Sequence, residues 1–284
     1  MGHGPCQLWG VLNVTPDSFS DGGHFMCVER AVDHARAMVA AGADVVDVGG
    51  ASSRPAGRAY GKGAPKVPPD EELRRTLPVV RQLVGEGVAV SIDTTSAEVA
   101  EAALGAGARY LNDVSCGADD VLLRVAAKFG ADYVLMHTRG DGAVAGQHIV
   151  YADVVSEVLS ELQDGVARAQ ACGVARERIW LDPGIGFAKT PAQSLRLLAA
   201  TAELSGLGQP VLVGPSRKAF IAATAPRPDG SIPGPGDRQP GTDAALAAAV
   251  LGGATAIRVH DVEASFQSLR VAAGIHAARA GVSA

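Results

Sequence analysis

Short apolar runs, each followed by a stretch with helical spacing, recur along this chain and limit what it can fold into. The apolar runs are Gln7–Val14, Val45–Gly49, Ala89–Asp93, Tyr110–Asp113, Tyr133–His137, Ile179–Asp182, Pro210–Gly214 and Ala256–Val259. The helical stretches are Cys27–Ala41, Pro69–Glu86, Ala97–Ala106, Asp119–Phe129, Val154–Cys172, Pro191–Ser205, Thr242–Leu251 and Val262–Ala280. The alternation predicts β-strands joined by crossover helices.

These repeats favour a closed barrel. Eight units in 284 residues leave about 35 residues for each, which is enough for a strand, a helix and two short loops. Parallel strands need crossover connections, and both faces of a parallel sheet must be buried. We therefore expect an α/β fold, a single (β/α)8 TIM barrel formed by residues 1–284 as one domain. An open, doubly wound sheet is the alternative, and it is disfavoured because no GxGxxG motif follows the first strand.

Composition narrows the class of protein. Hydrophobic residues make up 47% of the chain and charged residues 19%, as in a folded domain, and with only 4% aromatic residues the core should consist mostly of Ala, Val and Leu. A net charge of -5 without a basic block argues against a nucleic-acid partner. The four cysteines form no CxxC pair and no apolar run is long enough to span a membrane, so we expect a cytoplasmic protein without a membrane partner.

Three segments exceed ordinary loop length: Asn13–Met26, Gly50–Pro68 and Ala222–Gly241. The first two follow the first and second strands, so in a barrel they would overhang the same mouth, as lids often do. The third is rich in Pro and Gly, and we expect a flexible excursion there. The basic side chains of the second segment, which suit an anionic or carboxylate-bearing second substrate, are Arg54, Arg58, Lys62 and Lys66.

Polar side chains end almost every predicted strand, and in a barrel the carboxyl ends of the strands surround the active-site mouth. They are Asn13, Asp47, Asp93, Asn112, Asp113, His137, Asp182, Ser216, Lys218, Arg258 and His260. A buried polar group costs free energy unless it is paired, so a barrel that needed only stability would gain nothing from this ring. The ring therefore predicts a ligand-binding mouth.

The acidic and amide members of the ring suit a heterocycle with several N–H donors. Asp93 ends VAVSID and Asp182 ends IWLD, so two carboxylates would point into one mouth. Asn112 adds a side chain that both donates and accepts hydrogen bonds. The alternative is that each aspartate only caps the following helix, although hydroxyl residues at 94–96 could cap the helix after Asp93 instead.

The basic members of the ring suit an anion. Lys218 follows the seventh strand, where many barrels bind phosphate, and it can hold an anion, donate to a ligand carbonyl or form a Schiff base; a solvated surface lysine is the alternative. Arg258 and His260 alternate along an extended chain, so both can face the mouth and, with Asn13, cradle a diphosphate. A purely structural role is the alternative for His260 and also for His137.

Eight sequence motifs follow one another along the chain: GVLNVTPDSFSDGG, VDVGGASSRP, SIDT, LNDVS, VLMH, LDPGIGFAKT, LVGPSRKAF and IRVHDV. Together they resemble the dihydropteroate synthase family, over essentially the whole chain. Single motifs such as SIDT also occur in related pterin-binding barrels, whereas GIGFAKT, SRK and RVHDV in this order and spacing are specific to the synthases.

The resemblance implies a reaction of folate biosynthesis, in which 6-hydroxymethyl-7,8-dihydropterin diphosphate and p-aminobenzoate give 7,8-dihydropteroate and diphosphate, with Mg2+ as cofactor. A carboxylate near the exocyclic methylene would stabilise the positive charge that develops as the diphosphate leaves, and the amine would then attack. The resemblance also implies a homodimer, paired through outer helices, and a possible target of sulfonamides.

The family's functional residues fall on matching positions of this chain. The pterin pocket would comprise Asp93, Asn112, Met136, Asp182, Gly214 and Lys218. The diphosphate would be held by Asn13, Arg258 and His260, with Asn13 also touching the metal. The p-aminobenzoate site would comprise Ser53, Arg54, Pro55, Phe187, Ser216 and Lys218. The catalytic residues would be Asp93, Lys218 and Arg54.

The chain departs from the family pattern mainly in its second long segment. Where the family usually has GGESTRP this chain has GGASSRP, so Ala51 replaces a glutamate and Ser53 a threonine, and the stretch Arg58–Pro68 is longer. Pro215 is a further, modest change. Because the amine ligands lie on this loop and the pterin ligands on strand ends, we expect altered amine and sulfonamide affinity, ordinary pterin binding, and binding of the pterin diphosphate before the amine.

Three alternative functions remain. A pterin-dependent methyl-transfer module would keep the pterin pocket, but it would need a corrinoid-bearing partner and would not need Lys218 with Arg258 and His260. A non-catalytic or altered-specificity pterin-binding paralogue would keep the pocket and differ in the lids, as Ala51 does. A Schiff-base aldolase would use Lys218 as its nucleophile.

Overall fold

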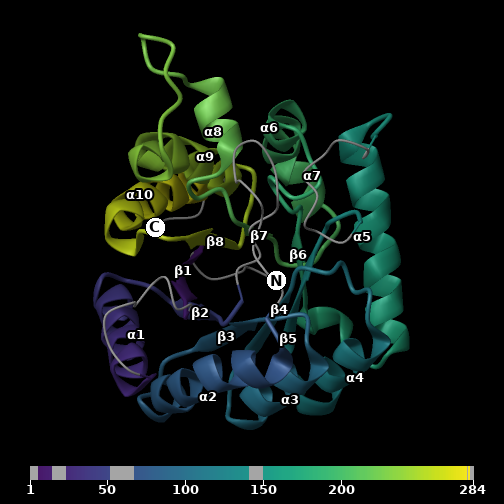
Figure 1. Ribbon diagram of the computed structural model, residues 1–284. Coiled ribbons are helices and arrows are strands. Elements are labelled where there is room, and N and C mark those ends of the chain that lie inside the picture. The colour runs from purple at the N-terminus through teal and green to yellow at the C-terminus, as the bar shows by residue number, and fades with distance from the viewer. Residues whose placement is uncertain (1–5, 15–23, 52–66, 141–149, 280, 282–284) are drawn as a thin grey trace.

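The computed structural model describes residues 6–14, 24–51, 67–140, 150–279 and 281, with only the backbone of residues 24–27. Strands and helices alternate along these residues, as the sequence predicts (Figure 1). The strands are β1 Gln7–Asn13, β2 Val45–Gly49, β3 Val90–Asp93, β4 Tyr110–Asp113, β5 Asp132–Met136, β6 Ile179–Asp182, β7 Leu212–Val213 and β8 Ala256–Val259. The helices are α1 His24–Ala40, α2 Pro69–Gly85, α3 Ala97–Gly105, α4 Asp120–Phe129, α5 Val154–Ala171, α6 Pro191–Ala199, α7 Thr201–Ser205, α8 Ala219–Thr224, α9 Gln239–Leu251 and α10 Val262–Arg279, with short 3-10 turns η2 Arg176–Arg178 and η3 Pro235–Arg238.

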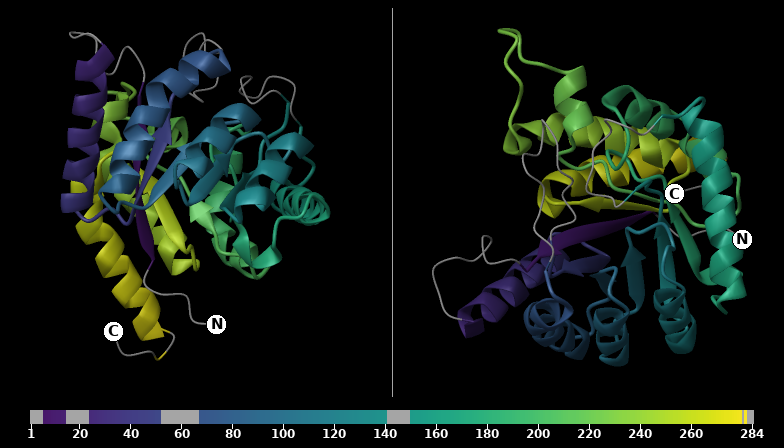
Figure 2. Two further views of the ribbon diagram at one scale, coloured as in Figure 1. Left: turned by 90° about the horizontal axis from the view of Figure 1, so that it is seen from below. Right: turned by 45° about the vertical axis from the view of Figure 1, so that its right-hand side comes forward.

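The strands form one parallel sheet in the order β6-β5-β4-β3-β2-β1-β8-β7. A bridge between Leu181 of β6 and Val211, just before β7, joins the two ends of that order, and the Leu181 amide donates to the Pro210 carbonyl at 2.9 Å. The sheet is thus a nearly closed barrel with helices around its outside, which the views of Figure 2 show from two sides. The predicted (β/α)8 TIM barrel is confirmed.

The side chains of each strand alternate between the outer helices and the barrel interior. On β2, for example, Val46 and Val48 face outward and join an extensive core cluster with the helices. That cluster consists mainly of Ala, Val and Leu, as the composition predicts. Aliphatic packing therefore joins the outward face of the sheet to the helices, and the inward side chains are not needed for that contact.

Aromatic rings fill the amino-terminal half of the barrel interior. The inward side chains there, which we call the floor, are Trp9, Val45, Tyr110, Val134, Trp180, Leu212 and Ala256. The ring centroid of Trp9 lies 4.6 Å from that of Tyr110 and 5.8 Å from that of Trp180. The floor differs in this from the mainly aliphatic core outside the sheet, because the wide centre of an eight-stranded barrel needs large side chains to fill it.

The predicted helix Pro191–Ser205 is wrong as a single element. It divides into α6 and α7 at Ala200, which closes α6 with backbone angles of φ −90° and ψ 15°. The hydroxyl of Thr201 donates to the Leu198 carbonyl at 2.7 Å. Such side-chain bonds compete with the helical ladder, and helical spacing alone does not reveal them.

The segment Ala222–Gly241 holds more regular structure than the expected flexible excursion. It includes the end of α8, the turn η3 and the start of α9. Arg238, only 6% exposed, donates to the carbonyls of Pro233 at 3.0 Å and Arg217 at 2.8 Å. These bonds anchor the segment, whose tip projects beyond α8 in Figure 1. Pro and Gly content indicated a break from helix but could not indicate this anchor.

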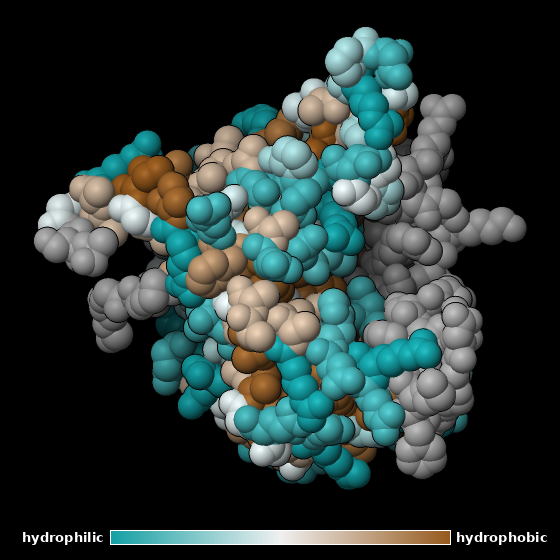
Figure 3. All heavy atoms as spheres, turned by 90° about the vertical axis from the view of Figure 1, so that its left-hand side faces the viewer, coloured by the Kyte–Doolittle hydropathy of each residue, from teal (hydrophilic) through white to brown (hydrophobic). Residues whose placement is uncertain are grey.

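The described surface is mixed. On the face shown in Figure 3, hydrophobic residues form separate patches among hydrophilic ones. The most exposed large apolar side chains include Val150 and Ile232, at 81% and 70% exposure. Among the helices described, none has the length and apolarity to cross a membrane.

Candidate active site

The carboxyl-terminal half of the barrel interior is largely polar. With a period of two along each strand, the inward positions beyond the floor bring the predicted strand-end residues together. We call this set the rim: Asn13, Asp47, Ser91, Asp93, Asn112, Met136, Asp182, Gly214 and Arg258. Asp113 and His137 fall one residue out of phase, and both bond to groups outside the rim. The rim is therefore the part of the barrel in which a ligand would meet polar side chains from several strands.

Arg258 connects two carboxylates across the interior. Its Nε donates to Asp47 Oδ2, and its Nη2 donates to Asp93 Oδ2 at 2.7 Å. Asn112 Nδ2 donates to the same Asp47 oxygen at 3.1 Å. Asp47 lies in the middle of β2 and is fully buried, and the sequence analysis gave it no individual ligand role. Among the described residues its ion-pair partner is Arg258, and these four side chains form one connected unit.

Neither pocket aspartate is a helix cap. The N-cap of α3 is Ser96, whose Oγ accepts from the Val99 amide, and the N-cap of α6 is Thr190. Asp182 instead accepts from the Gly184 amide at 2.7 Å, within the loop after β6. The capping alternative therefore fails for both Asp93 and Asp182.

Burial perturbs both aspartates. It raises the pKa of Asp93 to about 7, although the Arg258 charge opposes the shift. It also raises the pKa of Asp182, against the opposing charge of Lys218. The two side chains are only 7% and 6% exposed. Perturbed carboxyl groups in one pocket are typical of functional sites.

Lys218, on the loop after β7, faces the interior, so the solvated-lysine alternative fails, and we count this side chain with the rim. Its Nζ donates to the Ile185 carbonyl and lies 4.6 Å from the centroid of the Phe187 ring. Burial lowers the pKa of Lys218 to about 8, with Asp182 opposing. A Cβ added at Gly214 would lie 4.0 Å from Nζ, so Gly214 is next to the ammonium group. Phe187 and Lys218 therefore meet, as the implied p-aminobenzoate site requires.

Two left-handed residues stand beside these groups. Ala188 follows Phe187 with a φ of 50°, and Arg217 precedes Lys218 with a φ of 57°. A non-glycine residue in this region costs about 1–3 kcal/mol and persists only where its surroundings fix it. The Arg217 amide donates to Thr242 Oγ1 at 3.1 Å. The loops after β6 and β7 thus hold a strained residue directly beside Phe187 and directly beside Lys218.

His260 lies against Ser216. The backbone amide of His260 donates to Ser216 Oγ at 3.2 Å, and the ring Nδ1 lies 3.0 Å from the same oxygen. Burial, aided by the charge of Arg258, lowers the pKa of His260 to about 4, so its ring is neutral near pH 7. In the tautomer in which Ser216 Oγ donates its hydroxyl hydrogen to Nδ1, the ring hydrogen lies on Nε2. His260 can therefore donate to an anion through Nε2.

Three rim atoms lack a hydrogen-bond partner within the part of the chain that the structure describes: Asp47 Oδ1, Ser91 Oγ and Asn112 Oδ1. Buried polar atoms are normally paired, and an unpaired one costs about 1–3 kcal/mol. Two of the three are acceptors only. They suit a ligand that presents N–H groups, as the sequence predicts for a heterocycle.

His137 has a structural role. Beside it lies a buried lysine, Lys189, that the sequence did not indicate as a site residue. The His137 ring is fully buried, and its Nδ1 lies 2.9 Å from Lys189 Nζ. Burial lowers the pKa of Lys189 to about 7 and that of His137 to about 4. Lys189 stands at the end of GIGFAK, next to a helix cap, where a lysine is usually exposed. Nothing in local sequence signals its burial.

Ser53, Arg54 and Pro55 lie outside the described residues, as do most of the two expected lids. Asn13 is described, and its Oδ1 would lie 3.8 Å from a Cβ added at Gly49, which in turn would lie 3.6 Å from Asp93 Cβ. Asn13 therefore faces the same part of the rim as Asp93.

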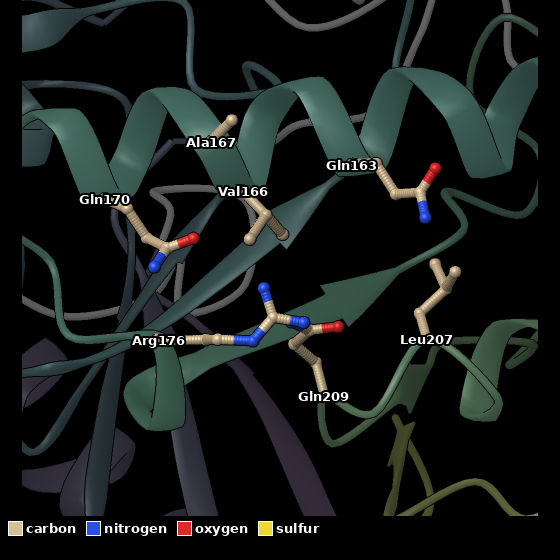
Figure 4. A pocket seen from close by; sticks show the side chains of 7 residues that line it. All are labelled: Gln163, Val166, Ala167, Gln170, Arg176, Leu207 and Gln209. Carbon is tan, nitrogen blue, oxygen red and sulfur yellow. The ribbon is translucent and has the colours of Figure 1, made fainter.

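A separate hollow lies at the opposite end of the barrel, by the amino ends of β6 and β7. It has a volume of about 190 Å3, and Figure 4 shows the side chains that line it: Gln163, Val166, Ala167, Gln170, Arg176, Leu207 and Gln209. In barrels of this type that end contributes stability, and chemistry takes place at the other. The rim is thus the candidate active site.

Comparison with known proteins agrees with this geometry. Residues 9–260 match the family of pterin binding enzymes. The dihydropteroate synthase of Mycobacterium leprae is 46% identical over 280 residues, covering 98% of this chain and 96% of that protein. The dihydropteroate synthase of Synechocystis is 45% identical, covering 93% of this chain and 88% of that protein.

Solved structures show the same fold with ligands. The Xanthomonas albilineans dihydropteroate synthase with 4-aminobenzoic acid has a TM-score of 0.86 and 39% identity, covering 98% of this chain and 95% of that one. The same enzyme in complex with 7,8-dihydropteroate has a TM-score of 0.82 and 37% identity, covering 98% and 96%. The Yersinia pestis dihydropteroate synthase in a sulfonamide complex has a TM-score of 0.86 and 35% identity, covering 98% and 96%. With its barrel, its polar rim and these likenesses, the chain belongs to the pterin-binding enzymes and, among them, to the dihydropteroate synthase family.

Proposed function

We propose that this chain is a catalytically active dihydropteroate synthase, which joins 6-hydroxymethyl-7,8-dihydropterin diphosphate to p-aminobenzoate and releases diphosphate. The observation that supports it most is the rim, where Asp93, Asn112, Asp182 and Lys218 lie in one interior with unpaired acceptor atoms. A pterin ring presents both N–H donors and a carbonyl. The carboxylates and the amide would meet the donors, and the Lys218 ammonium would meet the carbonyl.

The catalytic role of the rim would be electrostatic. As the bond between the methylene carbon and the diphosphate oxygen breaks, positive charge develops on the pterin. A carboxylate in a dry interior stabilises such charge strongly, and no activated nucleophile of the protein is needed. Asp93 is the best candidate, because it is buried, its only ion-pair partner among the described residues is Arg258, and Arg258 also pairs with Asp47. The amine nitrogen of p-aminobenzoate then forms the new bond to carbon and loses its proton.

The leaving diphosphate would meet Arg258, His260 and Asn13. Among the described residues, Arg258 donates through Nε and one Nη2 hydrogen, and its other N–H groups would bind an anion. His260 would add the Nε2 donor that Ser216 leaves exposed.

Mg2+ would fit beside this diphosphate. Mg2+ prefers oxygen ligands and usually takes one or two from the protein with the rest from waters and phosphates, and the Asn13 amide oxygen near Asp93 supplies such a donor. When bound, the ion would neutralise charge on the departing diphosphate.

The amine would bind at the outer edge of the rim. Phe187, Ser216 and Lys218 lie there, and Ser53, Arg54 and Pro55 would complete the site from the loop after β2. Sulfonamides would compete for the same place, as the Yersinia pestis complex illustrates for its own enzyme. A cytoplasmic homodimer paired through outer helices is part of the same proposal.

The methyl-transfer alternative is not favoured. It does not account for Lys218, Arg258 and His260 gathering around one mouth, whereas departure of a diphosphate does. A non-catalytic paralogue would bind pterin without forming product.

The deciding experiment incubates the protein with the dihydropterin diphosphate, Mg2+ and p-aminobenzoate. We expect 7,8-dihydropteroate and diphosphate in equal amounts, measured by chromatography and by a diphosphate assay, and no dihydropteroate without the amine. Asp132→Asn, at the amino end of β5, serves as the matched control for Asp93→Asn. Tight pterin binding without product in the unmodified protein would replace the proposal with the non-catalytic alternative.

A further inference from the structure

A second buried lysine lies behind the pocket, on the loop between β6 and α6. Lys189 is 6% exposed, and its Nζ lies 2.9 Å from His137 Nδ1, 3.0 Å from the Phe187 carbonyl and 3.3 Å from the His137 carbonyl. An ammonium group has three hydrogens, so these acceptors use all of them. Lys189 is therefore occupied by the protein and does not act as a ligand group.

His137 links Lys189 to the surface. Its Nε2 lies 3.0 Å from Glu161 Oε2 on α5, and Glu161 also pairs with Arg139. Because Lys189 donates to Nδ1, the ring hydrogen lies on Nε2 and donates to the Glu161 carboxylate. A buried lysine and a buried histidine are tolerated only when paired in this way. The result is a continuous path from α5 through β5 to the loop after β6.

That loop supplies two partners of the Lys218 ammonium group. The Ile185 carbonyl accepts from Lys218 Nζ, and the Phe187 ring lies beneath it. Lys189 holds the Phe187 carbonyl from behind, next to the left-handed Ala188, whose strain needs such support. At Gly184 the loop passes so close to β5 that an added Cβ would lie 1.9 Å from the His137 carbonyl. The loop is thus fixed against β5 on one side and presents Lys218 with its partners on the other.

We propose that Lys189, with His137 and Glu161, is a positioning group: it holds the loop after β6 so that Ile185 and Phe187 orient Lys218 toward the pterin. The inference rests on the proposed function, because it assigns Lys218 to the pterin site. Lys189 acts through the loop and touches no substrate. Near neutral pH the link needs no change of charge, since either form of the lysine can donate to His137.

A double-mutant cycle separates positioning from simple stabilisation. Lys189→Met removes the charge and the hydrogen bonds at similar volume. We expect pteroic acid to bind ~10- to 100-fold more weakly, because small displacements of a positioning group are costly. In a Lys218→Ala background the same substitution should cost less than about twofold, since its effect passes through Lys218. Equal losses in both backgrounds would overturn the inference.

Controls address folding. Circular dichroism and urea unfolding establish that each variant is folded at the assay temperature. If Lys189→Met does not fold, Glu161→Gln tests the outer end of the path at a half-exposed position, with an expected loss of ~2- to 10-fold that again vanishes in the Lys218→Ala background. Lys128→Met, an exposed lysine paired with Glu101, should leave binding unchanged. An effect of Glu161→Gln that persists without Lys218 would contradict the proposal.

The readout also keeps the two proposals apart. Turnover of the unmodified protein tests the synthase, whereas the cycle is measured by calorimetry with pteroic acid. If the unmodified protein turns over substrate but the binding effects of Lys189→Met and Lys218→Ala are additive, only the positioning role is refuted. Binding and coupling without turnover would refute the synthase and retain the positioning role. An unmodified protein that bound no pteroic acid would refute both.

Discussion

The floor and the rim of this barrel share the same strands but differ in chemistry. Tyr110 and Asn112 are both inward residues of β4, and Trp180 and Asp182 are both inward residues of β6. In the floor, three aromatic rings pack with centroids 4.6 to 5.8 Å apart and leave the barrel filled. In the rim, carboxylates share one guanidinium and three polar atoms of the described residues stay unpaired. A shift of two residues along a strand thus separates the packed floor from the polar candidate site.

The largest expected effect is on the floor. Trp9→Ala should reduce the free energy of unfolding by about 3–5 kcal/mol, because it opens a cavity at a fully buried position. Turnover per folded molecule should persist, since the rim is untouched. Urea denaturation and an activity assay at low temperature measure the two quantities, with Val121→Ala on the surface as control. Loss of turnover in fully folded protein would remove the division between floor and rim.

Rim substitutions should show the opposite pattern. Asp93→Asn and Lys218→Ala should each lower the rate by ~100-fold or more, because each removes a positioned electrostatic group. Their melting temperatures should stay close to that of the unmodified protein. Steady-state kinetics with both substrates and thermal unfolding provide the measurements. Normal turnover in either variant would withdraw that residue from the reaction.

Arg258→Ala tests the anion site. Diphosphate should bind ~10- to 100-fold more weakly, because a charged donor is lost and the carboxylates of Asp47 and Asp93 are left without their cation. Competition of diphosphate with the pterin diphosphate measures this, and Arg109→Ala, an exposed arginine paired with Asp132, is the matched control. Unchanged diphosphate affinity would locate the anion elsewhere.

The rim should also determine the pH dependence. Burial raises the pKa of Asp93 to about 7, so the carboxylate is lost as the pH falls below that value. Burial lowers the pKa of Lys218 to about 8, so the ammonium is lost as the pH rises above it. For the free enzyme, kcat/KM should therefore peak between pH 7 and 8 and fall ~10-fold per unit on either side. A flat profile from pH 5 to 10 would contradict both assignments.

The smallest effect is expected at Ser216. Ser216→Ala removes the hydroxyl that fixes the tautomer of His260, and diphosphate should bind ~2- to 10-fold more weakly. Ser216→Thr retains the hydroxyl and should restore affinity. If Ser216→Ala weakens only p-aminobenzoate, the serine belongs to the amine site alone.

The local sequence predicted the strands reliably, because the pattern that defines a strand lies within the segment itself. Apolar runs bounded by polar residues gave strands whose ends differ little from those observed, since alternation and length are properties of the segment itself. The break at Ala200 and the anchor at Arg238 depend on particular side-chain hydrogen bonds, from Thr201 to the Leu198 carbonyl and from Arg238 to the carbonyls of Pro233 and Arg217. A helical or Pro-rich pattern contains no information about those partners.

The sequence did not determine the phase of every strand, since Asp113 and His137, expected at the mouth, bond outside the rim. It did determine that every second side chain of a strand faces inward, because a strand has a period of two. Only the tertiary structure decided which of them meet. Arg258 lies 211 residues from Asp47 and 165 from Asp93, and closure of the barrel brings its guanidinium to both. The burial of Lys189 between two loop carbonyls and His137 was decided in the same way. Such contacts depend on the packing of distant segments, and no spacing within one segment can encode them.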